Sequence, residues 1–292
     1  MSVNDCVALL GELLPEPHAG LLAGLLFGTK QTLSPDFKQA LLTTGTLHII
    51  ALSGMNISIL SALLGQATTS VFGRKIALVL TLFVIWWFVW FVGPSSSIIR
   101  AASMGSLSIL ARVLGRQYWA LFALFVTVVV MLAVHPVWIG DLSFRLSILS
   151  TLGILLFGQN KNMNVQKNTD EENGLLYSDH HASLWMQGMK NIGKGLGNLL
   201  YDDLRLTFSA QIFTIPLIAF TFHRVSLISP VTNILIGWVI APLTGLGWIT
   251  LGVAMVAKPL SYVVALIPWA FLEYLIRTIQ IMSKLPFAGI EF

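Results

Sequence analysis

The stretch Ile76–Ile99, IALVLTLFVIWWFVWFVGPSSSII, decides the fold of this chain. It contains no Asp, Glu, Lys or Arg, and its first part, as far as Val92, is almost wholly apolar. A helix needs about 20 apolar residues to cross a bilayer. The stretch therefore predicts a membrane-spanning helix that ends at the Gly93-Pro94 pair, because glycine and proline interrupt helices.

The same composition extends through the rest of the chain. Apolar residues make up 55% of the 292 positions, charged residues only 10%, and the mean hydropathy is +0.80. In a soluble domain about a quarter of the residues are charged. The sequence thus predicts an all-α integral membrane protein, a polytopic bundle of about eight transmembrane helices with amphipathic helices on its surface. We expect spans near Leu41 to Leu64, Ile76 to Val92, Ser97 to Val113, Trp119 to Val134, Leu142 to Phe157, Leu206 to Phe222, Leu227 to Val256 and Tyr262 to Met282.

Two uncharged stretches have lengths that do not suit simple spans. Gln39 to Gly73 carries the Ser53-Gly54 pair near its middle, and Val225 to Ala257 is too long for one span and short for two. Irregular backbone at membrane depth is tolerated where protein or a wet cavity surrounds it. We therefore expect some of the helices to be broken or re-entrant.

The basic residues indicate an orientation. One set of alternate loops collects most of them, including Arg74, Lys75, Arg112 and Arg116, and the positive-inside rule places this side in the cytoplasm. We expect a single domain over residues 1–292, with an amphipathic N-terminal segment at 1–37. A cytoplasmic loop at 159–204 would carry an amphipathic surface helix around Trp185, Met189, Ile192, Leu196 and Leu199.

Few ionisable residues lie inside the predicted spans, and each is costly there. Glu273 and Arg277, four residues apart, can neutralise each other as an intrahelical ion pair. Asp141 and Arg145 have the same spacing, but nearby serines form a polar stripe. These two residues therefore fit a structural ion pair and a substrate pathway equally well. Arg100 has no acidic neighbour within a turn, and it must face a partner, carbonyls or water, or extend to the membrane surface.

Four motifs, in the same order, resemble segments of one protein family, the ComEC competence proteins. The first runs from His48 to Asn56, HIIALSGMN, and resembles the family's H-x-x-A-x-S-G-x-H/N segment. The others are Ile99-Arg100-Ala101; Asp141-Leu-Ser-Phe-Arg-Leu-Ser147; and Ser209-Ala-Gln211 through Pro216, Ser226, Pro230 and Asn233. The resemblance covers about Pro15 to Thr250. Two residues depart from what is usual in the family, since Asn56 stands where many members have His and Arg145 stands where Gln is usual.

The resemblance implies an inner-membrane, multi-pass channel for the uptake of single-stranded DNA during natural transformation of bacteria. It also implies an external DNA-delivery protein and a cytoplasmic ATPase or helicase as partners, and a homodimer is compatible with it. Arginines would screen the phosphates, and small residues would keep the passage open. The expected DNA-pathway residues are His48, Ser53, Gly54, Asn56, Arg100, Asp141, Arg145, Ser147, Gln211, Arg224 and Asn233.

No catalytic or cofactor site is expected. The chain has a single cysteine, its six histidines do not fall at metal-ligand spacings, and neither a phosphate-binding glycine loop nor a His-x-His-x-Asp-His nuclease cluster occurs. Two other functions stay open from the sequence. One is a secondary transporter for a small anion or sugar with a midplane site, and the other is a membrane scaffold whose polar residues only join helices.

Overall fold

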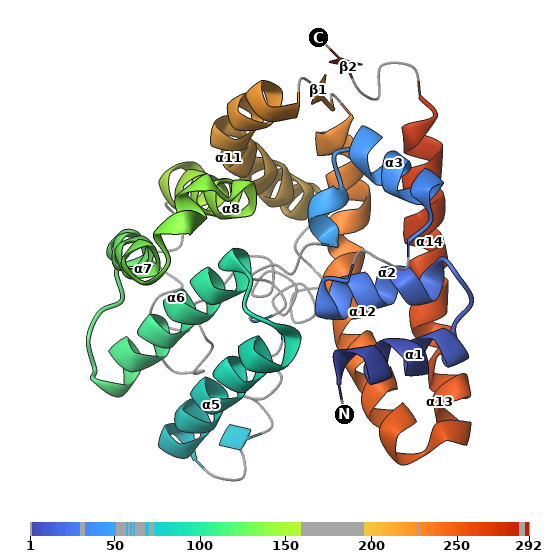
Figure 1. The fold of residues 1–292 in the computed structure, drawn as a ribbon, viewed down its shortest axis with the longest axis horizontal. Helices are drawn as coiled ribbons and strands as arrows, with labels where there is room; N and C mark the ends of the chain where they lie inside the picture. Colours follow the sequence, from blue (N-terminus) through green and yellow to red (C-terminus); the bar gives the residue numbers. More distant parts are fainter. Residues whose placement is uncertain are drawn as a thin grey trace. The chain divides into compact units, whose positions relative to one another are not determined.

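Helices joined by short turns make up the part of the chain that the computed structural model describes, with one pair of two-residue strands among them (Figure 1). The described residues are 2–29, 33–50, 73–158, 196–222, 224–226, 228–285 and 290–291, with positions 57, 59, 61, 68 and 69. The expected all-α class is confirmed for them. Contacts divide the chain into two compact units, the first comprising Met1–Asn56 with Ile218–Phe292 and the second Ile57–Leu217.

The first unit is built from the two ends of the chain. Its elements are α1 (Val3–Leu13), α2 (His18–Phe27), α3 (Pro35–Thr43), a 3-10 turn (Leu47–Ile49), β1 (Arg224–Val225), α12 (Ser229–Val256), α13 (Lys258–Val264), α14 (Leu266–Ser283) and β2 (Ile290–Glu291). The two short strands pair antiparallel, with Arg224 opposite Glu291.

Helix α2 forms the core of the first unit. All ten of its residues are buried, and it packs against α1, α12 and α14. A helix that is apolar on every side must be enclosed. Gly247 of α12 makes this possible, because a Cβ at that position would lie 2.8 Å from Leu22 Cδ1.

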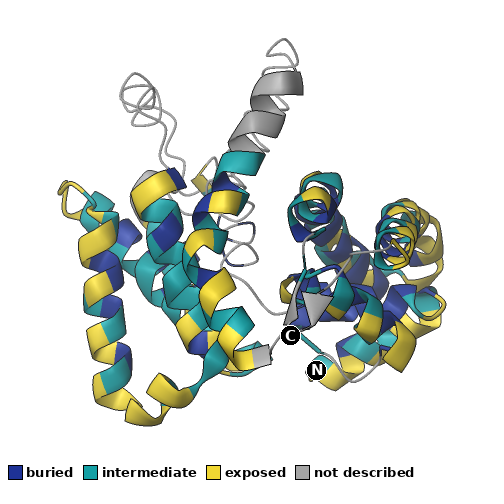
Figure 2. Cartoon of the chain, turned by 90° about the horizontal axis from the view of Figure 1, so that it is seen from above, coloured by how far each residue is buried: buried dark blue, intermediate teal, exposed yellow. Residues whose placement is uncertain are grey.

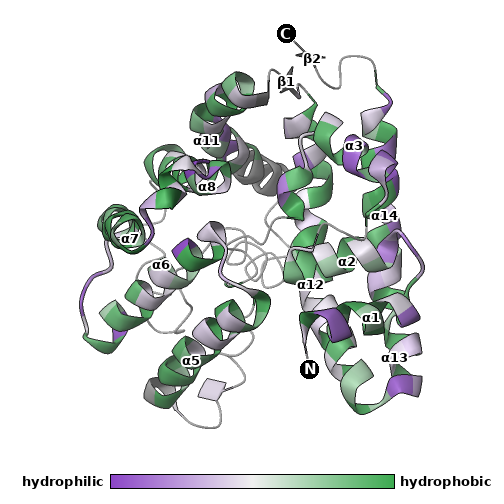
Figure 3. Ribbon diagram, viewed as in Figure 1, coloured by the Kyte–Doolittle hydropathy of each residue, from purple (hydrophilic) through white to green (hydrophobic). Residues whose placement is uncertain are grey.

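The second unit is a group of helices in which α6 packs against α5, α7 and α8. Its elements are α5 (Arg74–Val92), α6 (Ser96–Val113), α7 (Ala120–Val134), a 3-10 turn (Pro136–Gly140), α8 (Leu142–Gly153), a π-helical extension of α8 (Ile154–Gly158) and α11 (Leu196–Phe222), whose last residues belong to the first unit. Exposed residues lie along the outward sides of the helices (Figure 2), and on α7 they are mostly hydrophobic (Figure 3). Helix α5 also exposes a large hydrophobic side chain, Trp90, which is 78% exposed. Apolar outer surfaces of this kind suit contact with lipid.

Fewer described helices qualify as membrane spans than the eight predicted. Leu204–Thr221 of α11 and the whole of α12 are long and apolar enough, and the α13–α14 pair is a third if it counts as one span bent by 42°. The other apolar helices, including α2, α5 and α7, are shorter, with apolar parts of 10–17 residues. Of the predicted span Leu41 to Leu64, a large part lies outside the described residues.

The predicted irregularities differ from the helices observed. We expected a break within Val225 to Ala257, but α12 runs continuously through Pro242. Proline is tolerated inside membrane helices because neighbouring groups satisfy the carbonyl that it leaves unbonded. The bend lies instead near Ala265, between α13 and α14.

Two further predictions lie wholly or partly outside the described residues. The break at Ser53-Gly54 falls outside them, and so does most of the amphipathic helix around Trp185. The domain boundaries given above stay predictions.

Candidate functional site

Polar side chains of α6 and α8 face each other and form what we call the hydroxyl seam. Its members are Ser96, Ser97 and Arg100 of α6, Asp141 at the start of α8, and Ser143, Ser147 and Thr151 of α8. Ser96 Oγ donates to Asp141 Oδ2 over 2.6 Å, and the hydroxyls of Ser97 and Ser143 lie 3.2 Å apart. Residues of motifs far apart in the sequence therefore meet along one helix pair.

Arg100 is held at the centre of the seam. Its Nε donates to Ser147 Oγ at 2.7 Å, and one terminal nitrogen donates to Thr151 Oγ1 at 2.6 Å and lies 3.7 Å from Met104 Sδ. The side chain is half-buried. Neutral hydroxyls satisfy guanidinium donors without cancelling the charge, which arginine retains at any physiological pH.

Asp141 and Arg145 do not form the ion pair that their spacing allows. Asp141 is the N-cap of α8, where Oδ1 accepts from the Ser143 backbone N–H at 3.0 Å. Arg145 is exposed, and its Nε donates to the Ile139 carbonyl at 2.6 Å. Among the described residues no salt bridge joins Asp141 to Arg145, so Arg145 presents its charge to the surroundings.

The order of the seam contacts shows that α6 and α8 run in the same direction. Successive residues of α6, at 96, 97 and 100, meet successive residues of α8, at 141, 143 and 147. The N-termini of α6 and α8 therefore lie at the same end of the helix pair, and α7, which connects the two helices in the chain, runs in the opposite direction. Partial positive charge gathers at helix N-termini. Arg112, at the far end of α6, is on the predicted cytoplasmic side.

A glycine sets the position of α8 against α11. A Cβ on Gly153 would lie only 2.1 Å from the carbonyl oxygen of Ser209, so the two backbones touch at this point. Arg205 of α11 donates from Nε to the Phe157 carbonyl of the π-helical extension at 3.1 Å. Gln211, a predicted pathway residue, is half-buried on α11, two residues after Ser209.

The first unit has its own polar contact, which we call the Gly45 cluster: Gly45, His48, Ser226, Ser229 and Asn233. Gly45 has a positive φ of 68°, and a Cβ there would lie 2.8 Å from Ser229 Cβ and 3.2 Å from Ser226 Cβ. The loop from α3 thus packs directly on the start of α12. Only glycine combines this conformation with so close an approach.

The Gly45 cluster joins two predicted residues from distant motifs. His48 is exposed, and its Nδ1 lies 3.1 Å from the Gly45 carbonyl, so this nitrogen is the donor. Asn233 Nδ2 lies 3.4 Å from Ser229 Oγ. Sequence reasoning missed Gly45, although the Thr43-Thr44-Gly45-Thr46 run marks a turn.

The remaining predicted residues are less informative. The backbone of Arg224 lies in β1 opposite Glu291, and its side chain is outside the described part, as are Ser53, Gly54 and Asn56. Where the chain is described, no group of three or more His, Cys, Asp and Glu side chains is placed to hold a metal ion.

A second set of charged side chains lies between α2 and α14 of the first unit. Glu273 pairs with Arg277, as the sequence predicts, and also accepts from His18 Nε2 at 2.9 Å. The imidazole stacks on Trp269 with ring centroids 5.7 Å apart, and its other nitrogen is buried without a hydrogen-bond partner. Sequence spacing could not reveal His18, which lies 255 positions from Glu273.

Comparison with known proteins shows which family carries these motifs. A family model described as Competence protein matches residues 25–292, nearly the whole chain. The chain belongs to the Competence protein family. The resemblance to ComEC proteins is confirmed, and the matched range includes the hydroxyl seam and the Gly45 cluster.

Two relatives are longer than this member of the Competence family. The chain is 22% identical to ComE operon protein 3 of Bacillus subtilis over 78% of its own length and 26% of the relative. It is 32% identical to an uncharacterized protein of Aquifex aeolicus over 45% of its length and 31% of that relative. The matched parts thus cover less than a third of these relatives. No solved structure matches the chain.

Proposed function

We propose that the chain forms a channel through which single-stranded DNA crosses the inner membrane of a bacterium during natural transformation. Membership of the Competence family supports a role in DNA uptake. The observation that carries the proposal is the position of Arg100, half-buried among hydroxyls on a polar seam between α6 and α8. A permanent charge is costly at membrane depth and is typical of an ion or substrate pathway.

The hydroxyl seam has the chemistry that a moving polyanion requires. Arg100 and Arg145 supply positive charge, and the hydroxyls of Ser97, Ser143 and Ser147 can exchange hydrogen bonds with phosphate oxygens. Contacts with the phosphate backbone carry no base information, so they suit DNA of any sequence. Asp141 faces Ser96 and caps α8, which limits its repulsion of the strand.

Membrane topology and partners complete the proposal. The shorter apolar helices would join α11, α12 and the α13–α14 pair to give about eight spans in a multi-pass protein. The seam would face outward, where a DNA-delivery protein presents the strand. The chain itself would perform no enzymatic step, so a cytoplasmic ATPase or helicase, or an ion gradient, would supply the force. A homodimer is compatible with this arrangement.

Uptake of labelled single-stranded DNA into proteoliposomes that contain this chain alone tests the channel. The variant to compare is Arg100→Gln with Arg145→Gln, and the matched control is Arg277→Gln, an arginine already paired with Glu273. We expect uptake that falls as the salt concentration rises and that the double variant reduces by about tenfold or more. Electrostatic attraction raises the association rates of charged ligands by a factor of about 10 to 1,000.

A small anion and a neutral sugar serve as comparison solutes. Passage of these solutes without DNA would favour a small-solute transporter. Equal DNA uptake by well-folded double variant and wild type would remove the phosphate role of the two arginines.

A further inference from the structure

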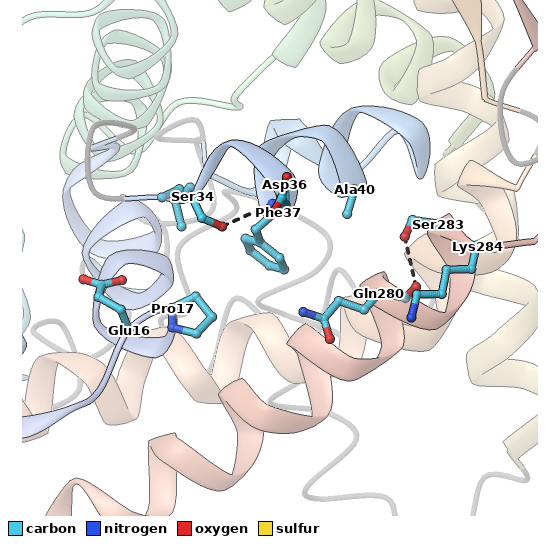
Figure 4. A pocket seen from close by; sticks show the side chains of 10 residues that line it. Glu16, Pro17, Ser34, Asp36, Phe37, Ala40, Gln280, Ser283 and Lys284 are labelled. Atoms are coloured by element: carbon cyan, nitrogen blue, oxygen red, sulfur yellow. Dashed lines mark hydrogen bonds between the residues drawn. The ribbon is translucent and has the colours of Figure 1, made fainter.

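A hollow of about 690 Å³ opens in the first unit between the start of α2, the start of α3 and the end of α14 (Figure 4). Asp36 and Phe37 line it from α3, Gln280 and Lys284 from the end of α14, and Glu16 from the turn before α2. Binding pockets for small molecules commonly have about 300–1,000 Å³. The volume is therefore sufficient for a small polar group.

Charges of both signs line the hollow. Asp36 and Lys284 are exposed, and within the described part of the chain neither takes part in a salt bridge. One oxygen of Glu16 accepts from the Gly20 backbone N–H at 3.3 Å, which leaves its other oxygen available. A ligand that matches this lining carries an anion for Lys284 and a hydrogen-bonding cation for the carboxylates.

The hollow lies at the end of a candidate membrane span. Helix α14 ends at Ser283, the α13–α14 pair is long and apolar enough to cross a bilayer, and Lys284 is the next residue. Lysines at span ends reach the level of the lipid headgroups. The buried Leu33 and Phe37 give the hollow an apolar wall beside its charges.

We propose that this hollow binds a phosphoethanolamine group. Lys284 would bind the phosphate, and Asp36 would accept hydrogen bonds from the primary ammonium, which has three N–H donors. A quaternary choline group offers no such donor, and a glycerol headgroup has no positive charge. The site would thus distinguish phosphatidylethanolamine from other phospholipids. Lipid binding here does not require DNA uptake, so the two can fail separately.

Native mass spectrometry of the purified chain tests the site. The probes are dioleoyl phosphatidylethanolamine, phosphatidylcholine and phosphatidylglycerol, offered at equal concentration. We expect about fivefold stronger retention of phosphatidylethanolamine, the effect of one modest ionic contact. Lys284→Gln and Asp36→Asn should each remove the preference. Lys38→Gln, which changes a lysine of α3 outside the hollow, should preserve it.

Competition by free O-phosphoethanolamine distinguishes the two sources of the ligand. Displacement of the lipid only at far higher concentration would identify a lipid headgroup as the natural ligand, and displacement at equal concentration would identify a soluble phosphoethanolamine compound. Both outcomes support the site. Equal retention of the three lipids, or a preference unchanged in Lys284→Gln and Asp36→Asn, would overturn it.

Discussion

The two units bond an arginine in different ways. In the first unit Arg277 pairs with Glu273, which also bonds His18, so the charge is compensated next to it. In the second unit Arg100 donates hydrogen bonds to the hydroxyls of Ser147 and Thr151. An ion pair fixes both of its partners, whereas hydroxyls can exchange their hydrogen bonds with the oxygens of a passing phosphate. We infer that the first pattern holds helices together and that the second serves transport.

The largest effect is expected from a change that displaces the hydroxyl seam. Gly153→Ala would put a Cβ about where the Ser209 carbonyl lies, so α8 and α11 must separate. Overpacking of this kind costs about 1–3 kcal/mol. We expect a lower thermal midpoint in detergent and weaker DNA uptake.

Gly105→Ala is the matched control for this change. Gly105 is buried on α6, but a Cβ there would meet nothing within 4 Å, so the variant should be as stable as the wild type or slightly more so. Equal midpoints for the two glycine variants would contradict the close approach of α8 and α11.

Removing either arginine alone tests the comparison most directly. Arg100→Gln should reduce DNA uptake by about tenfold, whereas Arg277→Gln should leave it unchanged. Both variants should insert into membranes in similar amounts. Equal loss of uptake in the two variants would mean that the kind of partner, carboxylate or hydroxyl, does not separate structural from functional arginines in this chain.

Loss of a carboxylate should affect stability rather than transport. Glu273→Gln leaves Arg277 and His18 without their negative partner, so we expect a thermal midpoint lower by a few degrees and unchanged uptake per folded molecule. Glu12→Gln, which breaks an exposed pair with Lys258, should change the midpoint less. The opposite ranking would show that the α2–α14 charges contribute little.

The smallest effect is expected at α1, outside both sets of charges. The Ser2 backbone N–H donates to Asp5 and lowers the pKa of its carboxyl. A lowered pKa means that the capping interaction stabilises α1 above the ordinary pKa of Asp, and that this stabilisation is lost as the pH falls through the lower folded value. The amides of α1 should therefore lose protection in acid, so that their hydrogen-exchange rate comes closer to the intrinsic rate of an unfolded chain at the same pH. Asp5→Asn should remove that dependence.

The sequence predicted the polar stripe of α8 and the importance of Arg100, because uncharged helices make each polar residue conspicuous. It could not predict that Arg100 meets Ser147 and Thr151, since their contact depends on how two helices pack. The same limit applies to His18 and Glu273, which come from opposite ends of the chain.

Local signals were less reliable for helix geometry. Pro242 and the glycines of α12 suggested a break, yet α12 is continuous, whereas the bend near Ala265 lies just before Pro268, which has no N–H to donate to the carbonyl four residues earlier. The close approaches at Gly45 and Gly153 were also hidden, because a glycine does not reveal which neighbour touches it. These two contacts decide where both polar clusters lie.

The discontinuous first unit has a consequence for how the protein is made. Helix α2 is synthesised before the second unit, but α12 and α14, which cover it, are synthesised after that unit. A ten-residue apolar helix is too short to rest stably across the bilayer on its own. We therefore expect α2 to need shielding from water, at the translocon or by a chaperone, until α12 and α14 have been synthesised.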